Sequence, residues 1–264
     1  MNLLKLIVHG GEFHADDVMC AAIARVVNPD VQIERVFQAP VCCEEGTVVA
    51  DIGGGRYDHH QQDAEKRENG DKYAACGLLL RDFWQQIFPD EASYRRFDDE
   101  VIRPIELADN GVVLNPFSLA VSSFVPNWDS EETMDQGFEK AVVFVTGFLE
   151  RQIEIAKSEL RARCLVEKAL AQSDGNIVVL PQFCPWQNTL VPSSAHFVIY
   201  PSNRGGYNLQ TVPEKVNGFI PKENLPEEWL TELPEGCTFV HQARFLAAFD
   251  TGEHAVFAAR SIIG

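Results

Sequence analysis

The sequence predicts an α/β protein: an N-terminal domain with a mainly parallel sheet flanked by helices, a long linking helix, and a smaller α+β C-terminal domain. Three observations support this. Apolar strands alternate with a helix near the N-terminus through short connections, which is typical of a right-handed βαβ unit. A long helical pattern runs to about residue 172, and the turn Ser173-Asp174-Gly175-Asn176 separates it from several short strands. We therefore expect two domains, residues 1–172 and 173–264.

The βαβ unit occupies the first part of the chain. Its expected elements are a strand over 3–8, a helix that begins near Asp16 and stops at Asn28-Pro29, and strands over 32–36 and 47–52. Ligands collect at the carboxyl ends of parallel strands. His9 and Asp51, which end the first and third strands, should therefore meet at one edge of the sheet.

Helical patterns fill the middle of the chain, and short strands follow. We expect helices over 73–87, over 92–107 with a kink at Pro104, and from the capping residues 129–132 to about 172. Residues 112–128 carry a mixed pattern and support no prediction. Beyond residue 176 the expected elements are strands at 177–180, 196–200, 207–212 and 238–241, and helices at 226–233 and 254–261. Three tryptophans, Trp128, Trp186 and Trp229, are expected in the core.

Composition points to an intracellular, cytoplasmic protein. Hydrophobic residues make up 45% and charged residues 23%, as in globular proteins. No apolar run approaches the roughly 20 residues of a membrane span, and the N-terminal apolar run is too short for a signal peptide. The seven cysteines are scattered with no CxxC pair, which predicts buried, reduced thiols.

The negative net charge limits which nucleic acids and other anionic substrates the protein could bind. A chain carrying −17 has no broad basic face to bind a nucleic-acid duplex independently of sequence. Bound divalent ions would supply local positive charge that the formal count ignores. Small phosphoesters and short strands therefore stay open as substrates.

Histidine and aspartate residues gather between His9 and His60. Four of the seven histidines lie in this window, and three of them lie within two residues of an aspartate. Imidazole and carboxylate ligands from separate chain turns are what a divalent transition-metal site requires. The candidate ligands, enough for two ions, are His9, His14, Asp16, Asp51, His59 and Asp109. Asp58 is the expected hydrogen-bond partner of His59, and Asp17 is expected to be a solvated residue of the first helical turn.

Several motifs resemble those of a known family. The run Asp58-His59-His60, behind a histidine-rich N-terminal motif and an isolated Asp51, is similar to the DHH phosphoesterase superfamily, which includes RecJ-type nucleases and manganese-dependent inorganic pyrophosphatases. The closer resemblance is to the MYG exonuclease family, the melanocyte-proliferating-gene proteins, regarded as nucleases acting on RNA. The segments that carry it are 9–16, 51–54, 57–61, 109–111, 209–213, 225–229 and 236–241, which together span nearly the whole chain.

The resemblance implies a hydrolase of phosphoester bonds with 3′–5′ exonuclease-like activity, in which two ions activate water. It places one ion on His9, His14 and Asp51, and the other on Asp16, Asp51, His59 and Asp109. His60, with Asp58, would face the substrate phosphate. Arg204, together with Lys222 and His241, would reach the scissile phosphate from the second domain.

The sequence departs from the superfamily pattern at two places. The superfamily usually begins His-x3-Asp-x-Asp, whereas this chain has His9-x4-His14-x-Asp16. A histidine in place of a carboxylate favours manganese, the expected ion, or iron, cobalt or zinc, over magnesium. The C-terminal domain also lacks a Gly-Gly-His motif, and Arg204-Gly205-Gly206 is its nearest equivalent.

Other functions stay open beside the favoured one, which is a nuclease or oligonucleotide phosphodiesterase acting on short single-stranded RNA or oligonucleotides. A small phosphoester or pyrophosphate is the second substrate class. A non-catalytic metal-binding regulator would keep the site for stability. An amide hydrolase would need a general-base motif such as HExxH, and Glu12 is the only nearby candidate. The sequence is compatible with a homodimer, and we expect no interaction with a membrane.

Overall fold

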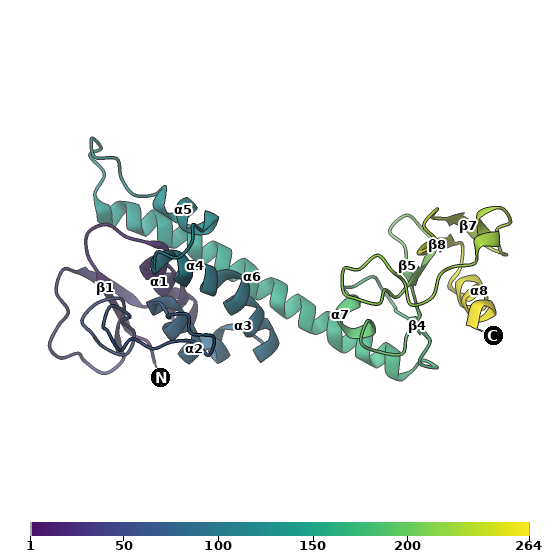
Figure 1. Ribbon diagram of the computed structural model, residues 1–264, viewed down its shortest axis with the longest axis horizontal. Coiled ribbons are helices and arrows are strands. Elements are labelled where there is room, and N and C mark those ends of the chain that lie inside the picture. The colour runs from purple at the N-terminus through teal and green to yellow at the C-terminus, as the bar shows by residue number, and fades with distance from the viewer. Residues whose placement is uncertain (1, 264) are drawn as a thin grey trace. The chain divides into compact units, whose positions relative to one another are not determined.

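The computed structural model describes residues 2–263 (Figure 1). The chain forms two compact units, one through Lys157 and the other from Ser158, and the division falls within the long helix α6 (Met134–Ala171). The first unit holds a parallel sheet with helices and the second a mixed sheet. The predicted α/β class is confirmed.

A three-stranded parallel sheet organises the N-terminal unit. Its strands are β1 (Lys5–His9), β2 (Gln32–Val36) and β3 (Thr47–Val49), in the order β2-β1-β3. Lys5 pairs in register with both Gln32 and Thr47, so all three strands end at the same edge. His9 therefore lies at that edge, and Asp51 follows β3 two residues later.

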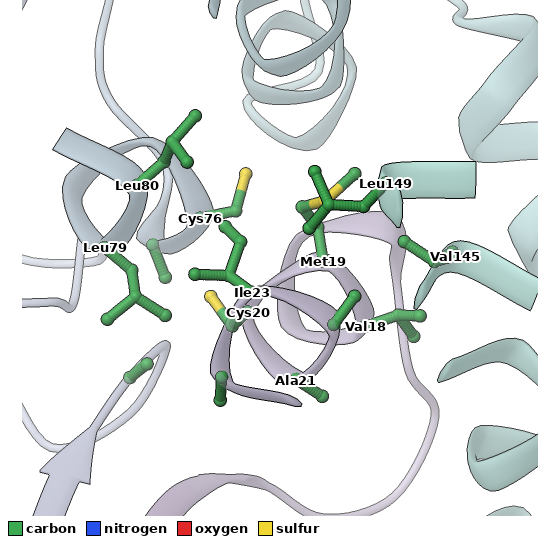
Figure 2. Packing of buried hydrophobic residues seen from close by; sticks show 14 of the residues in the cluster. Val18, Met19, Cys20, Ala21, Ile23, Cys76, Leu79, Leu80, Val145 and Leu149 are labelled. Carbon is green, nitrogen blue, oxygen red and sulfur yellow. The ribbon is translucent and has the colours of Figure 1, made fainter. Parts of the chain in front are cut away.

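The helices of this unit pack against one another and, through α1, against β1. They are α1 (Ala15–Val27), α2 (Ala75–Ile87), α3 (Glu91–Phe97), the π-helix η1 (Asp98–Ile102), α4 (Arg103–Asp109) and α5 (Pro116–Ser122), together with the first part of α6. Helix α1 is buried from Ala15 to Ala24. Figure 2 shows Met19 and Ile23 of α1 packed among Cys76 and Leu79 of α2 and Leu149 of α6. A helix buried all round fixes its own first turn, which carries Asp16 and Asp17.

The middle of this unit departs from the sequence prediction. The helix expected over 92–107, with a kink or split at Pro104, is found as three consecutive helical segments, in which α3 passes through η1 into α4. Pro104 has no N–H, and its ring crowds the carbonyl of residue 100, so the helical ladder widens to a π turn just before it. The segment without a prediction holds α5, in which the Asn115 side chain caps the N-terminus by accepting a hydrogen bond from the Phe117 N–H.

The C-terminal unit is built on a five-stranded mixed sheet. Its strands are β4 (Ile177–Val179), β5 (Phe197–Pro201), β6 (Tyr207–Thr211), β7 (Cys237–Val240) and β8 (Leu246–Phe249), in the order β4-β5-β6-β8-β7. Its shorter helices are α7 (Gln187–Leu190), the 3-10 turn η2 (Glu227–Leu230) and α8 (Gly252–Ile263). The expected helix over 226–233 is thus only this short turn. Strand β8 has no counterpart among the elements that the sequence predicts, because its two alanines are weak strand formers.

Three further expectations can be compared with the structure. Trp186 and Trp229 are buried as predicted, but Trp128 is 96% exposed, so its assignment to the core is wrong. All seven cysteines are free; Cys20, Cys76 and Cys184 are buried, whereas Cys42, Cys43 and Cys164 are exposed against expectation. Among the described residues, no helix combines the length and apolarity needed to cross a membrane.

Candidate metal centre

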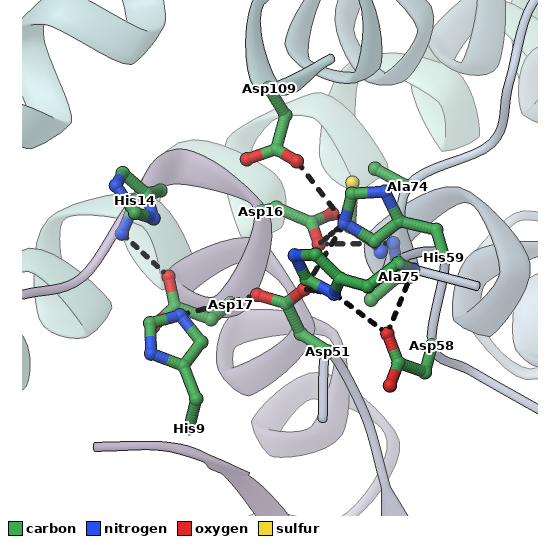
Figure 3. A network of polar contacts seen from close by, with 12 residues as sticks. His9, His14, Asp16, Asp17, Asp51, Asp58, His59, Ala74, Ala75 and Asp109 are labelled. Carbon is green, nitrogen blue, oxygen red and sulfur yellow. Dashed lines mark hydrogen bonds and ion pairs between the residues drawn. The ribbon is translucent and has the colours of Figure 1, made fainter. Parts of the chain in front are cut away.

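Imidazole and carboxylate side chains converge at the carboxyl edge of the N-terminal sheet (Figure 3). They come from the end of β1, the first turn of α1, the residue two positions after β3, the loop after Tyr57, and the end of α4. Three groups have ligand atoms within 4.8 Å of one another: His9, Asp17 and Asp51; Asp16, His59 and Asp109; and Asp51, His59 and His60. Five of the six predicted ligands thus come together.

Asp51 is shared between groups, and its backbone is unusual. Its Oδ2 lies 3.3 Å from His9 Nε2, and its Oδ1 lies 3.1 Å from His59 Nε2. Its φ angle is 60°, in the left-handed region that non-glycine residues rarely adopt. The Asp51 N–H donates to Tyr57 O, which holds this conformation. A strained residue held in place by its surroundings is common at functional sites.

Asp17 joins the first group, although we expected it to be solvated. It is fully buried, and its Oδ2 lies 3.4 Å from His9 Nε2. Its Oδ1 accepts hydrogen bonds from the N–H groups of His14 and Val18, so that it caps α1 from the third helical position. Sequence reasoning missed Asp17, and the signal that could have found it is this capping position directly after Asp16.

Asp16 belongs to the second group and is held by another helix. Its two carboxylate oxygens accept hydrogen bonds from the N–H groups of Ala75 (3.0 Å) and Cys76 (2.8 Å) at the start of α2. Unpaired N–H groups and the helix dipole both favour a carboxylate there. His59 Nε2 lies 3.8 Å from Asp16 Oδ2 and 3.2 Å from Asp109 Oδ2. The group is therefore fixed by α1, α2 and α4 together.

His60 differs from His59 in exposure and in partner. The His60 side chain is 64% exposed and that of His59 5%. Asp58 Oδ1 lies 2.7 Å from His60 Nδ1, and Asp58 Oδ2 accepts from the Gly54 N–H. The expected pairing of Asp58 with His59 is therefore replaced by pairing with His60, because the chain turns between the two histidines.

Mutual contacts shift the pKa values of the three residues that contact one another most closely. The hydrogen bond to Asp51 raises the pKa of His9 to about 9. Burial opposes the charged form of His59, but hydrogen bonds to Asp109 and Asp51 outweigh it and raise its pKa to about 10. Burial likewise opposes the charge of Asp51, yet both histidines hold its pKa at about 2. Without a cation, the imidazolium ions therefore neutralise the carboxylates.

The other two aspartates of α1 are shifted in the opposite direction. Burial, with the neighbouring Asp51 and Asp109, raises the pKa of Asp16 well above its usual range. Burial raises the pKa of Asp17 to about 7, although His9 opposes the shift. Asp17 Oδ2 is buried and has no hydrogen-bond partner within the described part of the chain. A buried carboxylate oxygen that makes no hydrogen bond and lies 3.4 Å from an imidazole nitrogen fits a divalent cation.

His14 is the predicted ligand that the groups do not include. Its side chain belongs to an exposed residue at the N-terminus of α1, and its ring centroid lies 5.9 Å from that of His9. His14 lines the same cavity as His9. The structure thus places it beside the centre, with Asp17 in the position expected for it.

A cavity of about 750 Å³ opens onto these groups. Its metal-centre side includes His9, Asp51, His60 and Asp109, and residues of α4 and α5 and the loop between them form another side. Those residues are Ile105, Ala108, Val113, Leu114, Asn115, Ser118, Leu119 and Ser122. No lysine or arginine lines the cavity among the described residues. Positive charge for an anionic substrate would therefore come from histidines and bound cations.

The remaining predicted residues belong to the C-terminal unit. Arg204 is exposed and lines a separate cavity. The Lys222 ammonium donates to the carbonyl oxygens of Leu190, Ser193 and Ala195, which uses all three of its N–H groups. His241 lies after β7, and its Nδ1 accepts from the Ala243 N–H. This geometry favours a structural role for Lys222.

Comparison with known proteins identifies the family. A sequence model described as "MYG1_exonuc: Uncharacterised protein family (UPF0160)" matches residues 5–263. The chain belongs to the MYG1 exonuclease family. It is 27% identical to the human protein named MYG1 exonuclease, over 97% of this chain and 84% of that protein. It is 26% identical to the MYG1 protein of Dictyostelium discoideum (98% and 96%) and 27% identical to that of Schizosaccharomyces pombe (99% and 98%). The family predicted from the motifs is confirmed.

Proposed function

We propose that this protein is a divalent-metal-dependent phosphoesterase. The observation that carries the proposal is the set of three His/Asp groups that meet at Asp51 and open onto one cavity. Within the family, the rat, human and mouse relatives are named MYG1 exonuclease, which supports phosphoester bonds as the target.

Two of the three groups would hold one ion each, and Asp51, a member of the first group, would lie next to both ions. One group consists of His9, Asp17 and Asp51, and the other of Asp16, His59 and Asp109, joined by Asp51 Oδ1 next to His59. Imidazole together with carboxylate favours manganese, iron, cobalt or zinc, and manganese is our first choice. When bound, such a pair of ions supplies an activated water and neutralises charge on phosphate oxygens.

Side chains of the protein would position the ligands and donate a proton to the substrate. Asp58 fixes the ring of His60 through Nδ1 and leaves Nε2 without a partner among residues 2–263. A protonated His60 would donate from Nε2 to a phosphate or leaving-group oxygen. The N–H groups of α2 keep both oxygens of Asp16 in place, and the burial of Asp16, Asp17 and His59 excludes bulk water from the ligand side.

The cavity favours the end of a single strand over a duplex. A volume of about 750 Å³ lies within the roughly 300–1,000 Å³ range of small-molecule sites, so a terminal nucleotide fits. The aliphatic residues of α5 and its preceding loop would contact the nucleoside. The net charge of −17 disfavours duplex binding. We therefore propose exonuclease-type hydrolysis of short single-stranded RNA or oligonucleotides, with small phosphoesters or pyrophosphate as the second substrate class.

The proposal is tested with short RNA, short DNA, a p-nitrophenyl phosphodiester and pyrophosphate, each with added Mn²⁺. Wild type is compared with Asp51→Ala and with Asp63→Ala, an exposed aspartate outside the three groups. We expect wild type and Asp63→Ala to hydrolyse oligonucleotides and Asp51→Ala to lose the activity. Measured metal binding without turnover of any phosphoester would refute the enzyme and leave a metal-binding regulator.

A further inference from the structure

A second cavity lies on the sheet of the C-terminal unit, on the face opposite α8. The α8 side chains pack on Ile199, Leu209 and Phe249, whereas the alternating positions of the same strands point to the other face. There the cavity measures about 710 Å³. Its lining residues are Phe183, Tyr200, Pro201, Ser202, Asn203, Arg204, Gly205, Asn208, Thr238, Phe239, Leu246 and Ala248.

Aromatic rings line this cavity. Phe183 is 56% exposed and Phe239 50% exposed, so both rings are open to a ligand, whereas Tyr200 is 6% exposed. The ring centroids of Phe183 and Tyr200 are 5.2 Å apart. The Tyr200 hydroxyl donates to Gln210 Oε1, which fixes the ring. A β-bulge between Cys237 and Phe239 changes the direction of the Phe239 side chain.

The charge of the lining is opposite to that of the chain. The sequence has 39 acidic residues, yet none lines this cavity, and Arg204 is its one charged residue among those described. The Arg204 guanidinium and the Asn203 amide make no hydrogen bond or ion pair within residues 2–263. Free donors beside exposed rings suit an anionic ligand with flat, polar-edged rings.

Backbone hydrogen bonds and a glycine fix the turn that carries Arg204 against β8. The Ser202 N–H donates to Gly206 O, and the Gly205 N–H donates to Ser202 O. Gly206 has a φ of 66°, and a Cβ there would lie 2.1 Å from Phe249 O, so only glycine allows the turn to pack against β8. The arginine is thereby held at the edge of the cavity.

We propose that this surface, the platform of Phe183, Arg204 and Phe239 beside the buried Tyr200, binds single-stranded nucleic acid by base stacking. The inference rests on the proposed function for the class of substrate. Stacking rings together with a guanidinium that contacts backbone phosphates is the way proteins bind single strands without reading sequence. The Asn203 and Asn208 amides would contact base edges. The bases of a duplex are already stacked on one another, so they are not available to stack on these rings.

The test measures binding without turnover. The full-length protein is titrated, in excess chelator and low salt, against a fluorescein-labelled oligoadenylate of roughly six nucleotides, a length within the site sizes typical of such surfaces. We expect Phe183→Ala and Phe239→Ala to weaken binding about 5-fold or more each, because stacking on one ring contributes that much. Arg204→Ala should weaken binding and reduce its salt dependence.

Matched controls separate the platform from general effects. Phe257→Ala and Arg260→Ala remove an exposed phenylalanine and an exposed arginine of α8 and should leave binding unchanged. Phe239→Trp should retain binding and Phe239→Leu should not, which distinguishes stacking from apolar packing. Equal binding by Phe239→Ala and Phe257→Ala, equal binding of a duplex, or no binding by wild type would each overturn the inference. Because the chelator removes turnover, these outcomes are independent of whether the protein hydrolyses phosphoesters.

Discussion

Metal binding should release protons from the two buried imidazoles. The pKa of His9 is raised to about 9 and that of His59 to about 10, so both are almost fully protonated at pH 8 in the metal-free protein. A histidine binds a metal only through a deprotonated nitrogen. Two ions should therefore displace about two imidazole protons per chain, with any proton on the buried Asp16 adding to this number. Each site holds one of these histidines, so its apparent affinity should rise about 10-fold per pH unit below pH 9.

The assay is a titration of Mn²⁺ into metal-free protein in weakly buffered solution at pH 8, with proton release followed by pH-stat. His59→Gln removes one of the two imidazoles and should release about one proton fewer. Asp63→Ala, outside the three groups, should behave like wild type. Metal binding without proton release, or with an affinity independent of pH between 6 and 9, would refute the ligand role of His9 and His59.

The remaining predictions concern stability and affinity. The pKa values of His9 and His59 are raised, so between the unfolded-state pKa near 6.5 and about pH 9–10 the native metal-free protein holds more protons than the unfolded chain. Its free energy of unfolding should therefore fall as pH rises through that window. Urea titrations at pH 6 and pH 9.5 measure the fall. Asp17→Asn keeps the N–H acceptor and removes a buried charge, so thermal unfolding should show a more stable metal-free protein while calorimetry shows weaker Mn²⁺ binding; unchanged affinity would remove Asp17 from the site. Arg67→Ala leaves the buried Glu106 carboxylate without its ion pair and should cost about 3–5 kcal/mol in urea unfolding, whereas Arg95→Ala, an exposed pair on α3, should cost under about 1 kcal/mol; equal costs would contradict the ranking by burial. Chelator should lower the melting temperature of protein purified with metal, and an unchanged temperature would mean that no ion is bound.

The sequence was informative where local patterns and sheet geometry agree. The βαβ unit followed from apolar runs with short connections, and the rule that strand ends share an edge correctly placed His9 and Asp51 together. The long helix was also recognisable, because its helical pattern is uninterrupted, although Thr133 caps it and not the predicted residues 129–132. These features depend on residues near one another in sequence.

The errors came from contacts between distant segments. The burial of Asp17 depends on α1 being covered on all sides, and charge in a first helical turn usually indicates solvent. The choice of Asp58 between two adjacent histidines depends on the loop path, which residue spacing does not fix. Trp128 is exposed although its size suggested the core. The platform on the C-terminal sheet could not be predicted from the sequence, because only the folded unit brings Phe183 and Phe239 to one cavity.

Locating bound manganese by anomalous diffraction from crystals grown with Mn²⁺ tests the central claim most directly. The account predicts two peaks on either side of Asp51, one contacting His9 and Asp17 and the other contacting Asp16, His59 and Asp109. Crystals that bind manganese elsewhere, with no peak in contact with Asp51, would contradict it.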